Sequence, residues 1–187
     1  MNSNQQLRSG VFIDGSNVMW GSLTVSKEKR WLIDFAKLKT YLDKEYKPLF
    51  VKYYGIEDMK PREARFKTRA KFMTHIYRKL TQLGYELITK PLKYIRLQDG
   101  RFTTKGDMDV EITMGIMDNM DTLDRIILIS GDSDYLPLIE RMHNKSKQII
   151  IIAFDKLLAW ELRTFTQNNK NCKYTKIESI RGQIELK

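Results

Sequence analysis

Several aspartates in this chain stand where apolar runs meet turn-forming residues, as in sites built from carboxylates. Asp14 follows the run 11–13, Asp132 and Asp134 follow the run 126–129, and Asp107 and Asp109 precede a helical pattern. Two carboxylates about 4 Å apart repel by roughly 4 kcal/mol at an effective dielectric near 20, so a group of them needs protons, water or a cation. Oxygen ligands without His or Cys favour Mg²⁺ or Mn²⁺. Each aspartate alone could instead cap a turn or a helix, but together they predict a shared metal site.

Polar and basic side chains near these aspartates could serve the same site. The Asn17 amide could orient a water or a phosphate oxygen, and Ser16, Ser130 and Lys105 could donate hydrogen bonds to phosphate. Each of the four also has an ordinary role as a turn former or a solvated side chain.

Alternating apolar runs and helical patterns predict the scaffold that positions these residues. Strands are expected over 11–13, 50–54, 85–89, 125–129 and 148–153, and helices over 34–46, 61–83, 107–120, 133–144 and 156–166. Residues 14–17 are expected to form a functional loop, and Asp99-Gly100 a small β-hairpin near residues 93–105. The alternation predicts an α/β fold with a parallel sheet covered on both sides, and it puts the site beyond the carboxyl ends of the strands.

Length and composition favour one globular domain over residues 1–187, with a core of about 9–178. The chain has 187 residues, of which 42% are hydrophobic, which is enough to build one core. No apolar run approaches the ~20 residues of a membrane span, and the first residues lack the apolar core of a secretion signal, so a cytoplasmic protein is expected. The single cysteine, Cys172, excludes an internal disulfide and a multi-thiolate zinc site.

The positive charge is concentrated in one predicted helix. Residues 60–79 contain eight Lys and Arg against one acid, which is +7 of the net +10 of the chain. The ordinary interpretation is a solvated amphipathic helix with an apolar stripe facing the core. Too few acids are present to pair these cations at helical spacing, so we predict that Arg65, Arg69 and Lys71 face phosphate.

Other chemistries lack their motifs. The chain has no GxxxxGK[ST], GxGxxG or GxSxG pattern, which argues against P-loop, Rossmann and serine-hydrolase sites. An aspartyl-phosphate mechanism of the haloacid-dehalogenase type needs two aspartates two positions apart at the first motif. Ser16 or Phe12 would stand at one of those positions, so this mechanism is disfavoured.

Three segments carry a family resemblance. VFIDGSN at 11–17, KGDMDV at 105–110 and ISGDSDYLPL at 129–138 resemble, in this order, the LabA-like branch of NYN domains in the PIN-like nuclease superfamily. The resemblance extends from Val11 to about Ile177. It implies a three-layer αβα sandwich with a mostly parallel sheet, and a Mg²⁺- or Mn²⁺-dependent ribonuclease that hydrolyses RNA phosphodiester bonds. The metal-holding and catalytic positions are matched by Asp14, Asp109, Asp132 and Asp134, and Asn17 matches the polar residue of the first motif.

One position departs from the family pattern. Family members often carry a further aspartate about six residues after the one matched by Asp109, and this chain has Gly115 there. Asp107, Glu111 or Asp118 could compensate. We therefore expect an RNA-directed metal-dependent nuclease, with a catalytically weak or silent RNA-binding or regulatory module as the alternative. RNA is the expected partner, and the sequence leaves self-association open.

Overall fold

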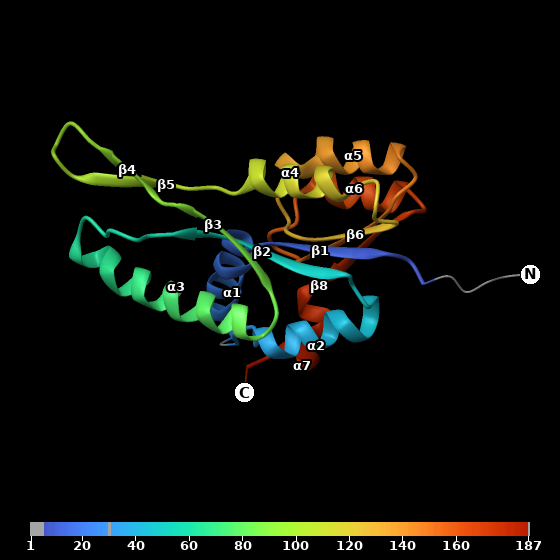
Figure 1. Cartoon of the computed structure of the whole chain (residues 1–187), viewed down its shortest axis with the longest axis horizontal. Coiled ribbons are helices and arrows are strands. Elements are labelled where there is room, and N and C mark those ends of the chain that lie inside the picture. Colours follow the sequence, from blue (N-terminus) through green and yellow to red (C-terminus); the bar gives the residue numbers. More distant parts are fainter. Residues whose placement is uncertain (1–5, 30, 187) are drawn as a thin grey trace, which may run out of the picture.

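The fold is organised around a six-stranded sheet in which every neighbouring pair is parallel (Figure 1). The structure, a computed structural model, describes residues 6–29 and 31–186, except for the side chains of residues 25–29 and Arg65. The strands are β1 (Ser9–Asp14), β2 (Phe50–Glu57), β3 (Glu86–Pro91), β6 (Arg125–Ile129), β7 (Gln148–Ala153) and β8 (Cys172–Lys176). Their order is β3-β2-β1-β6-β7-β8, so the sheet is built outward in both directions from β1.

Helices cover both faces of the sheet, as Figure 1 shows. One face carries α1 (Gly15–Lys29), α2 (Phe35–Tyr46), α3 (Ala64–Gln82) and α7 (Arg181–Ile184), and the other carries α4 (Asp109–Asn119), α5 (Leu136–Asn144) and α6 (Trp160–Asn168). Alternate side chains of β1 feed the two cores: Val11 and Ile13 belong to the first, Phe12 to the second. The predicted three-layer αβα sandwich is therefore confirmed. None of the described helices has the length and apolar content needed to cross a membrane.

Local signals explain why α2 has the bounds that it has. The Asp34 carboxylate accepts hydrogen bonds from the backbone N–H groups of Ala36 (2.8 Å) and Lys37 (3.3 Å), which satisfies two of the free donors at the start of the helix. Lys47 ends the helix in the left-handed region, with φ of 45°, and Pro48 prevents its continuation.

The predicted β-hairpin is confirmed as a separate element. Strands β4 (Lys93–Arg96) and β5 (Phe102–Lys105) pair antiparallel with each other, outside the six-stranded sheet. Gly100 in the connecting turn has a φ of 80°, which a glycine adopts without steric cost. In Figure 1 the hairpin projects from the main body beside the beginning of α3.

Some expected elements differ from the structure. The expected loop at residues 14–17 is wrong, because helix α1 begins at Gly15 directly after Asp14. The sequence of α1 is rich in Gly, Ser and Thr and has no clear apolar stripe, so its periodicity gave no signal. Strand β8 was also not predicted: it is a five-residue edge strand with three polar side chains.

Candidate active site

The predicted acidic residues lie at the carboxyl edge of the sheet, where the strand order changes direction. Asp14 is the last residue of β1, and Asp132 and Asp134 follow the end of β6. Asp109 is the first residue of α4. Because β1 and β6 are parallel neighbours, their carboxyl ends bring together segments that are distant in the sequence.

The Asp14 carboxylate is buried and held by three hydrogen bonds. It is 5% exposed. Its Oδ1 accepts from the Asn17 backbone N–H (3.0 Å), and its Oδ2 accepts from the hydroxyls of Ser130 (3.2 Å) and Tyr135 (3.4 Å). These bonds fix the carboxylate in one orientation. Ser130 therefore uses its proton on Asp14, so the phosphate contact predicted for it would have to replace this hydrogen bond.

Tyr135 links Asp14 to Asp109. Its side chain is fully buried, and its hydroxyl donates to Asp109 Oδ1 at 2.8 Å while lying 3.4 Å from Asp14 Oδ2. A tyrosine hydroxyl has one proton, so the shorter bond to Asp109 receives most of it. Our sequence reasoning gave Tyr135 no role, although it follows two of the predicted acids directly and belongs to the third motif.

Electrostatics bring a third carboxylate into this group. Burial is the main cause that raises the pKa of Asp14, and the charges of Asp109 and Asp132 raise it further against the hydrogen bonds from Asn17 and Ser130. Burial also raises the pKa of Asp109, opposed by the Tyr135 hydrogen bond and reinforced by the charge of Asp132. Asp14, Asp109 and Asp132 thus repel one another within one partly desolvated region.

The third motif combines a capping role with its place in the site. Asp132 accepts a hydrogen bond from the backbone N–H of Asp134 (3.0 Å) and caps the short 3₁₀ helix Ser133–Tyr135. Asp134 is exposed, so it lies at the rim of the group. Asp132 therefore fulfils the ordinary capping interpretation while its charge still acts on Asp14 and Asp109.

Asn17 and Gly131 join the first motif to the third. The Asn17 side-chain oxygen accepts from the Gly131 backbone N–H at 3.2 Å, so it holds the two segments together. A Cβ at Gly131 would collide with the backbone carbonyl of Leu157, which explains the glycine at this position. Ser16 is exposed beside Asn17 and has no hydrogen bond among the described residues.

The comparisons with known proteins agree with these motifs. The family model for the NYN domain matches residues 8–172. The chain belongs to the NYN domain family. This confirms the resemblance inferred from the three motifs.

Relatives of this NYN domain include a curated protein and several solved structures. It is 27% identical over 181 residues to the low amplitude and bright protein LabA of Synechococcus elongatus, covering 95% of this chain and 88% of that protein. A crystal structure of a Vibrio parahaemolyticus protein of unknown function matches with a TM-score of 0.70 and 24% identity over the whole of both chains. A mutant of the T5 5′-exonuclease and the T5 D15 protein co-crystallised with metal ions each match 86% of this chain, with a TM-score of 0.51 and 13% identity, and 56% and 59% of their own chains. These last matches show a shared nuclease fold.

The donor chemistry of this NYN domain fits a hard divalent cation, although the described residues are not arranged around one. Carboxylates that raise one another's pKa are relieved by a nearby cation, and Asp14, Asp109 and Asp132 offer only oxygen ligands. Within residues 6–29 and 31–186, no group of three or more His, Cys, Asp or Glu side chains is already placed to hold a metal ion. Binding a cation therefore requires these carboxylates to rearrange.

The space where the family often carries a further aspartate is filled by Tyr54. A Cβ at Gly115 would overlap the Tyr54 hydroxyl and lie 3.2 Å from Tyr54 Cζ, and Tyr54 is 2% exposed. The acids suggested as compensation are engaged elsewhere or exposed. Lys90 pairs with Glu111 (2.7 Å) and Asp107 (3.6 Å) at distances short enough for ion pairs.

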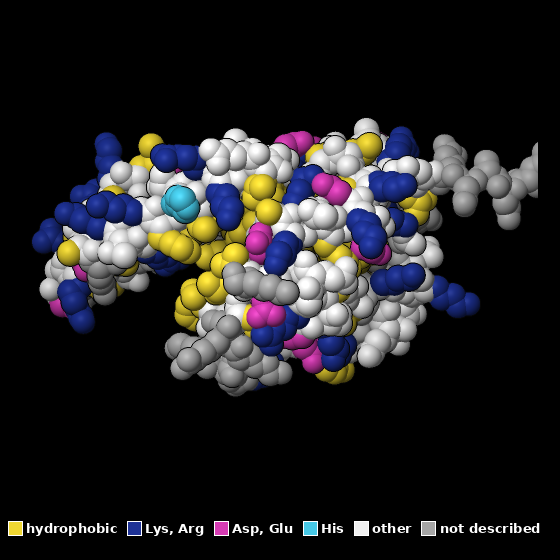
Figure 2. Space-filling model, turned by 90° about the horizontal axis from the view of Figure 1, so that it is seen from below, with side chains coloured by type: hydrophobic (Ala, Val, Ile, Leu, Met, Phe, Trp, Pro, Cys, Tyr) yellow, Lys and Arg dark blue, Asp and Glu magenta, His cyan; other side chains and the backbone are white. Residues whose placement is uncertain are grey.

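The predicted basic contacts lie apart from the acidic group. Arg69 and Lys71 are exposed on α3, and Lys105 is exposed at the end of β5, four residues before Asp109. The side chain of Arg65 lies outside the described part of the chain. Figure 2 shows Lys and Arg side chains gathered over the projecting part of the molecule, on the side of α3.

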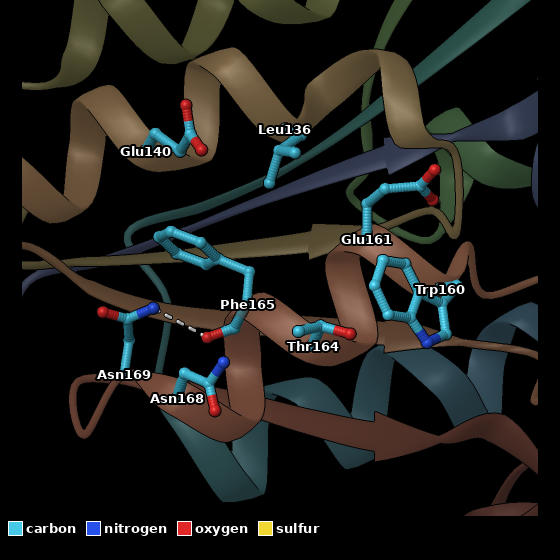
Figure 3. Close-up of a pocket in the computed structure, with 8 residues that line it drawn as sticks. All are labelled: Leu136, Glu140, Trp160, Glu161, Thr164, Phe165, Asn168 and Asn169. Carbon is cyan, nitrogen blue, oxygen red and sulfur yellow. Dashed lines mark hydrogen bonds between the residues drawn. The ribbon is translucent and has the colours of Figure 1, made fainter.

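A hollow of about 290 Å³ between α5 and α6 contains none of the predicted site residues (Figure 3). Trp160, 72% exposed, and Phe165 contribute apolar surface to it, and Glu140 and Glu161 contribute negative charge. Two carboxylates in its lining disfavour phosphate, so this hollow does not extend the candidate site.

Proposed function

We propose that this NYN domain is a divalent-metal-dependent nuclease that hydrolyses RNA phosphodiester bonds. The observation that supports this most directly is the convergence of Asp14, Asp109 and Asp132 at the carboxyl edge of the sheet, with mutual repulsion that raises the pKa of Asp14 and Asp109. The fold shared with T5 exonuclease, and the metal ions in the T5 D15 crystals, agree with this chemistry.

In this proposal Asp14, Asp109 and Asp132 hold Mg²⁺ or Mn²⁺, with Asp134 contributing at the rim. When bound, such a cation neutralises charge at the reacting phosphate and lowers the pKa of a water. Tyr135, together with Ser130, orients the carboxylates through the hydrogen bonds described above.

Other groups of the chain would bind and orient the RNA. Ser16 and Lys105 are exposed and free to contact phosphate, and Asn17 keeps the first and third motifs together. The cations of α3 supply attraction that does not depend on base sequence, because phosphate contacts release counterions whatever the base.

A second function is favoured by a different observation. No described group of acids is already arranged for a metal, Tyr54 blocks the position of Gly115, and Lys90 engages Glu111 and Asp107. A catalytically weak or silent RNA-binding module of the same fold would retain the basic surface and need no complete set of acids.

A metal-rescue experiment separates the two functions. The purified chain is incubated with labelled single-stranded RNA in chelator, and then with excess Mg²⁺ or Mn²⁺; a DNA strand of the same sequence tests the preference for RNA. We expect cleavage only with metal, and loss of cleavage in Asp14→Asn, whose amide removes the charge but keeps the size. Asp121→Asn is the matched control, because Asp121 is exposed before β6, at the opposite end of the sheet.

Each result of this experiment decides between the functions. RNA binding without cleavage under every metal condition would favour the silent module. Cleavage by Asp14→Asn at the wild-type rate would show that Asp14 holds no required metal.

A further inference from the structure

The β4–β5 hairpin connects directly to the candidate site. Three residues separate the end of β5 at Lys105 from Asp109, the first residue of α4. At its other end, the backbone N–H of Leu92 donates to the carbonyl of Glu57 at the end of β2 (2.9 Å). The base of the hairpin is therefore fixed beside the carboxyl edge of the sheet.

One face of the hairpin is anchored on the segment that begins α3. Tyr94 and Phe102 lie on this face, and the Tyr94 ring packs edge-on against Phe66 (centroids 5.4 Å apart) and Phe102 (6.1 Å). The Phe102 backbone N–H also donates to a Glu63 carboxylate oxygen at 3.2 Å. These contacts hold the hairpin at a defined orientation, with its other face exposed.

The exposed face combines an unpaired positive charge with an apolar side chain. Lys93 lies directly opposite Lys105, and Ile95 lies opposite Thr103 in the next position of the same face. All four are exposed, Ile95 at 46%. Like charges directly opposite in a β-ladder are destabilising, and neither lysine has an ion pair among the described residues. An anion on this face would relieve the repulsion.

The charge of the chain is concentrated around this face. Residues 58–105, which include α3 and the hairpin, contain thirteen Lys and Arg and four Asp and Glu, or +9 of the net +10. The partner of such a region is a polyanion. An exposed isoleucine next to the lysine pair adds a surface for unpaired bases, which a duplex keeps stacked inside.

We propose that the exposed face of the β4–β5 hairpin binds the backbone of single-stranded nucleic acid through Lys93 and Lys105 and leads the strand toward Asp109. This inference rests on the proposed nuclease function for the direction of the strand. Lys93 and Lys105 contact phosphates, and Ile95 contacts a base. The hairpin then makes the chain selective for unpaired strands.

The test compares Lys93→Gln/Lys105→Gln with a pair that removes the same charge elsewhere. Lys145→Gln/Lys170→Gln is the control, because both lysines are exposed at the opposite edge of the sheet, just before β7 and β8. Binding of labelled single-stranded RNA is titrated in chelator at several salt concentrations. With about 0.7 units per phosphate contact, the hairpin pair should flatten the slope of log affinity against log salt by about 1.4 units, and the control pair should leave it unchanged.

Two further arms test the choice of an unpaired strand. The wild-type chain should bind the single strand more tightly than the same strand annealed to its complement. Ile95→Ala should weaken single-strand binding without changing the salt slope, because an apolar contact releases no counterions. Melting temperatures of all variants are measured, and the hairpin pair should melt no lower than wild type, since it removes a repulsion.

The results separate this inference from the nuclease proposal. Equal slopes for the two double variants, or equal affinity for single strand and duplex, would overturn the role of the hairpin even if RNA is cleaved. Slopes that differ as expected, without cleavage in any metal, would retain the hairpin and reject the nuclease.

Discussion

The packing of Tyr54 against Gly115 predicts that a methyl group at position 115 destabilises the protein. In an exposed helix Gly→Ala stabilises by about 0.5–1 kcal/mol, because alanine loses less backbone entropy on folding. At Gly115 the new Cβ overlaps the Tyr54 hydroxyl, and Tyr54 is 2% exposed and cannot move freely. Overpacking of this kind costs about 1–3 kcal/mol, so we expect a net loss of about 1–2 kcal/mol for Gly115→Ala.

Removing the hydroxyl should remove most of this loss. In Tyr54→Phe the atom closest to the new Cβ is Cζ, at 3.2 Å, which a shift of a few tenths of an ångström accommodates. Gly115→Ala should therefore cost less than about 0.5 kcal/mol in the Tyr54→Phe background. The two substitutions should then show a coupling free energy of about 1 kcal/mol or more.

The assay is urea unfolding of wild type, both single variants and the double variant, with thermal melting as a second measure. For a chain of this length, 1 kcal/mol shifts the melting temperature by about 2–4 °C. Gly182→Ala is the matched control, because a Cβ at Gly182 meets nothing within 4 Å. A Gly115→Ala variant as stable as Gly182→Ala, or an equal cost with and without the Tyr54 hydroxyl, would refute this explanation of the glycine.

Two further predictions concern the acidic group and the basic helix. Burial and neighbouring charges raise the pKa of Asp14, so its ionisation costs folding free energy at neutral pH, and Asp14→Asn should raise the melting temperature in chelator. That advantage should shrink as the pH falls toward the ordinary aspartate pKa of about 4, where the wild-type carboxyl becomes neutral; a difference independent of pH would contradict the assigned cause. Replacing Arg65, Arg69 and Lys71 with Gln should flatten the salt slope of single-stranded RNA binding by roughly two units, at about 0.7 per contact, and an unchanged slope would show that these side chains face away from the RNA.

The sequence by itself determined the elements whose signals are local. The runs at 125–129 and 148–153 are strands with the predicted bounds, because continuous β-branched residues buried on both faces leave little ambiguity. Asp34 fixed the start of α2, and Asp99-Gly100 fixed the turn of the hairpin. The motifs carried the family and, with it, the nuclease fold.

Only the tertiary structure decided which of these residues touch. The Tyr135 hydroxyl between Asp14 and Asp109, the use of the Ser130 proton on Asp14, and Tyr54 in the place of a side chain at position 115 all join segments that are distant in the sequence. Composition and periodicity describe neighbours along the chain, whereas these contacts depend on the register of β1 against β2 and β6 and on the helices packed above them. The sheet registers pair residues 40 and more than 100 positions apart, so no local pattern encodes these contacts.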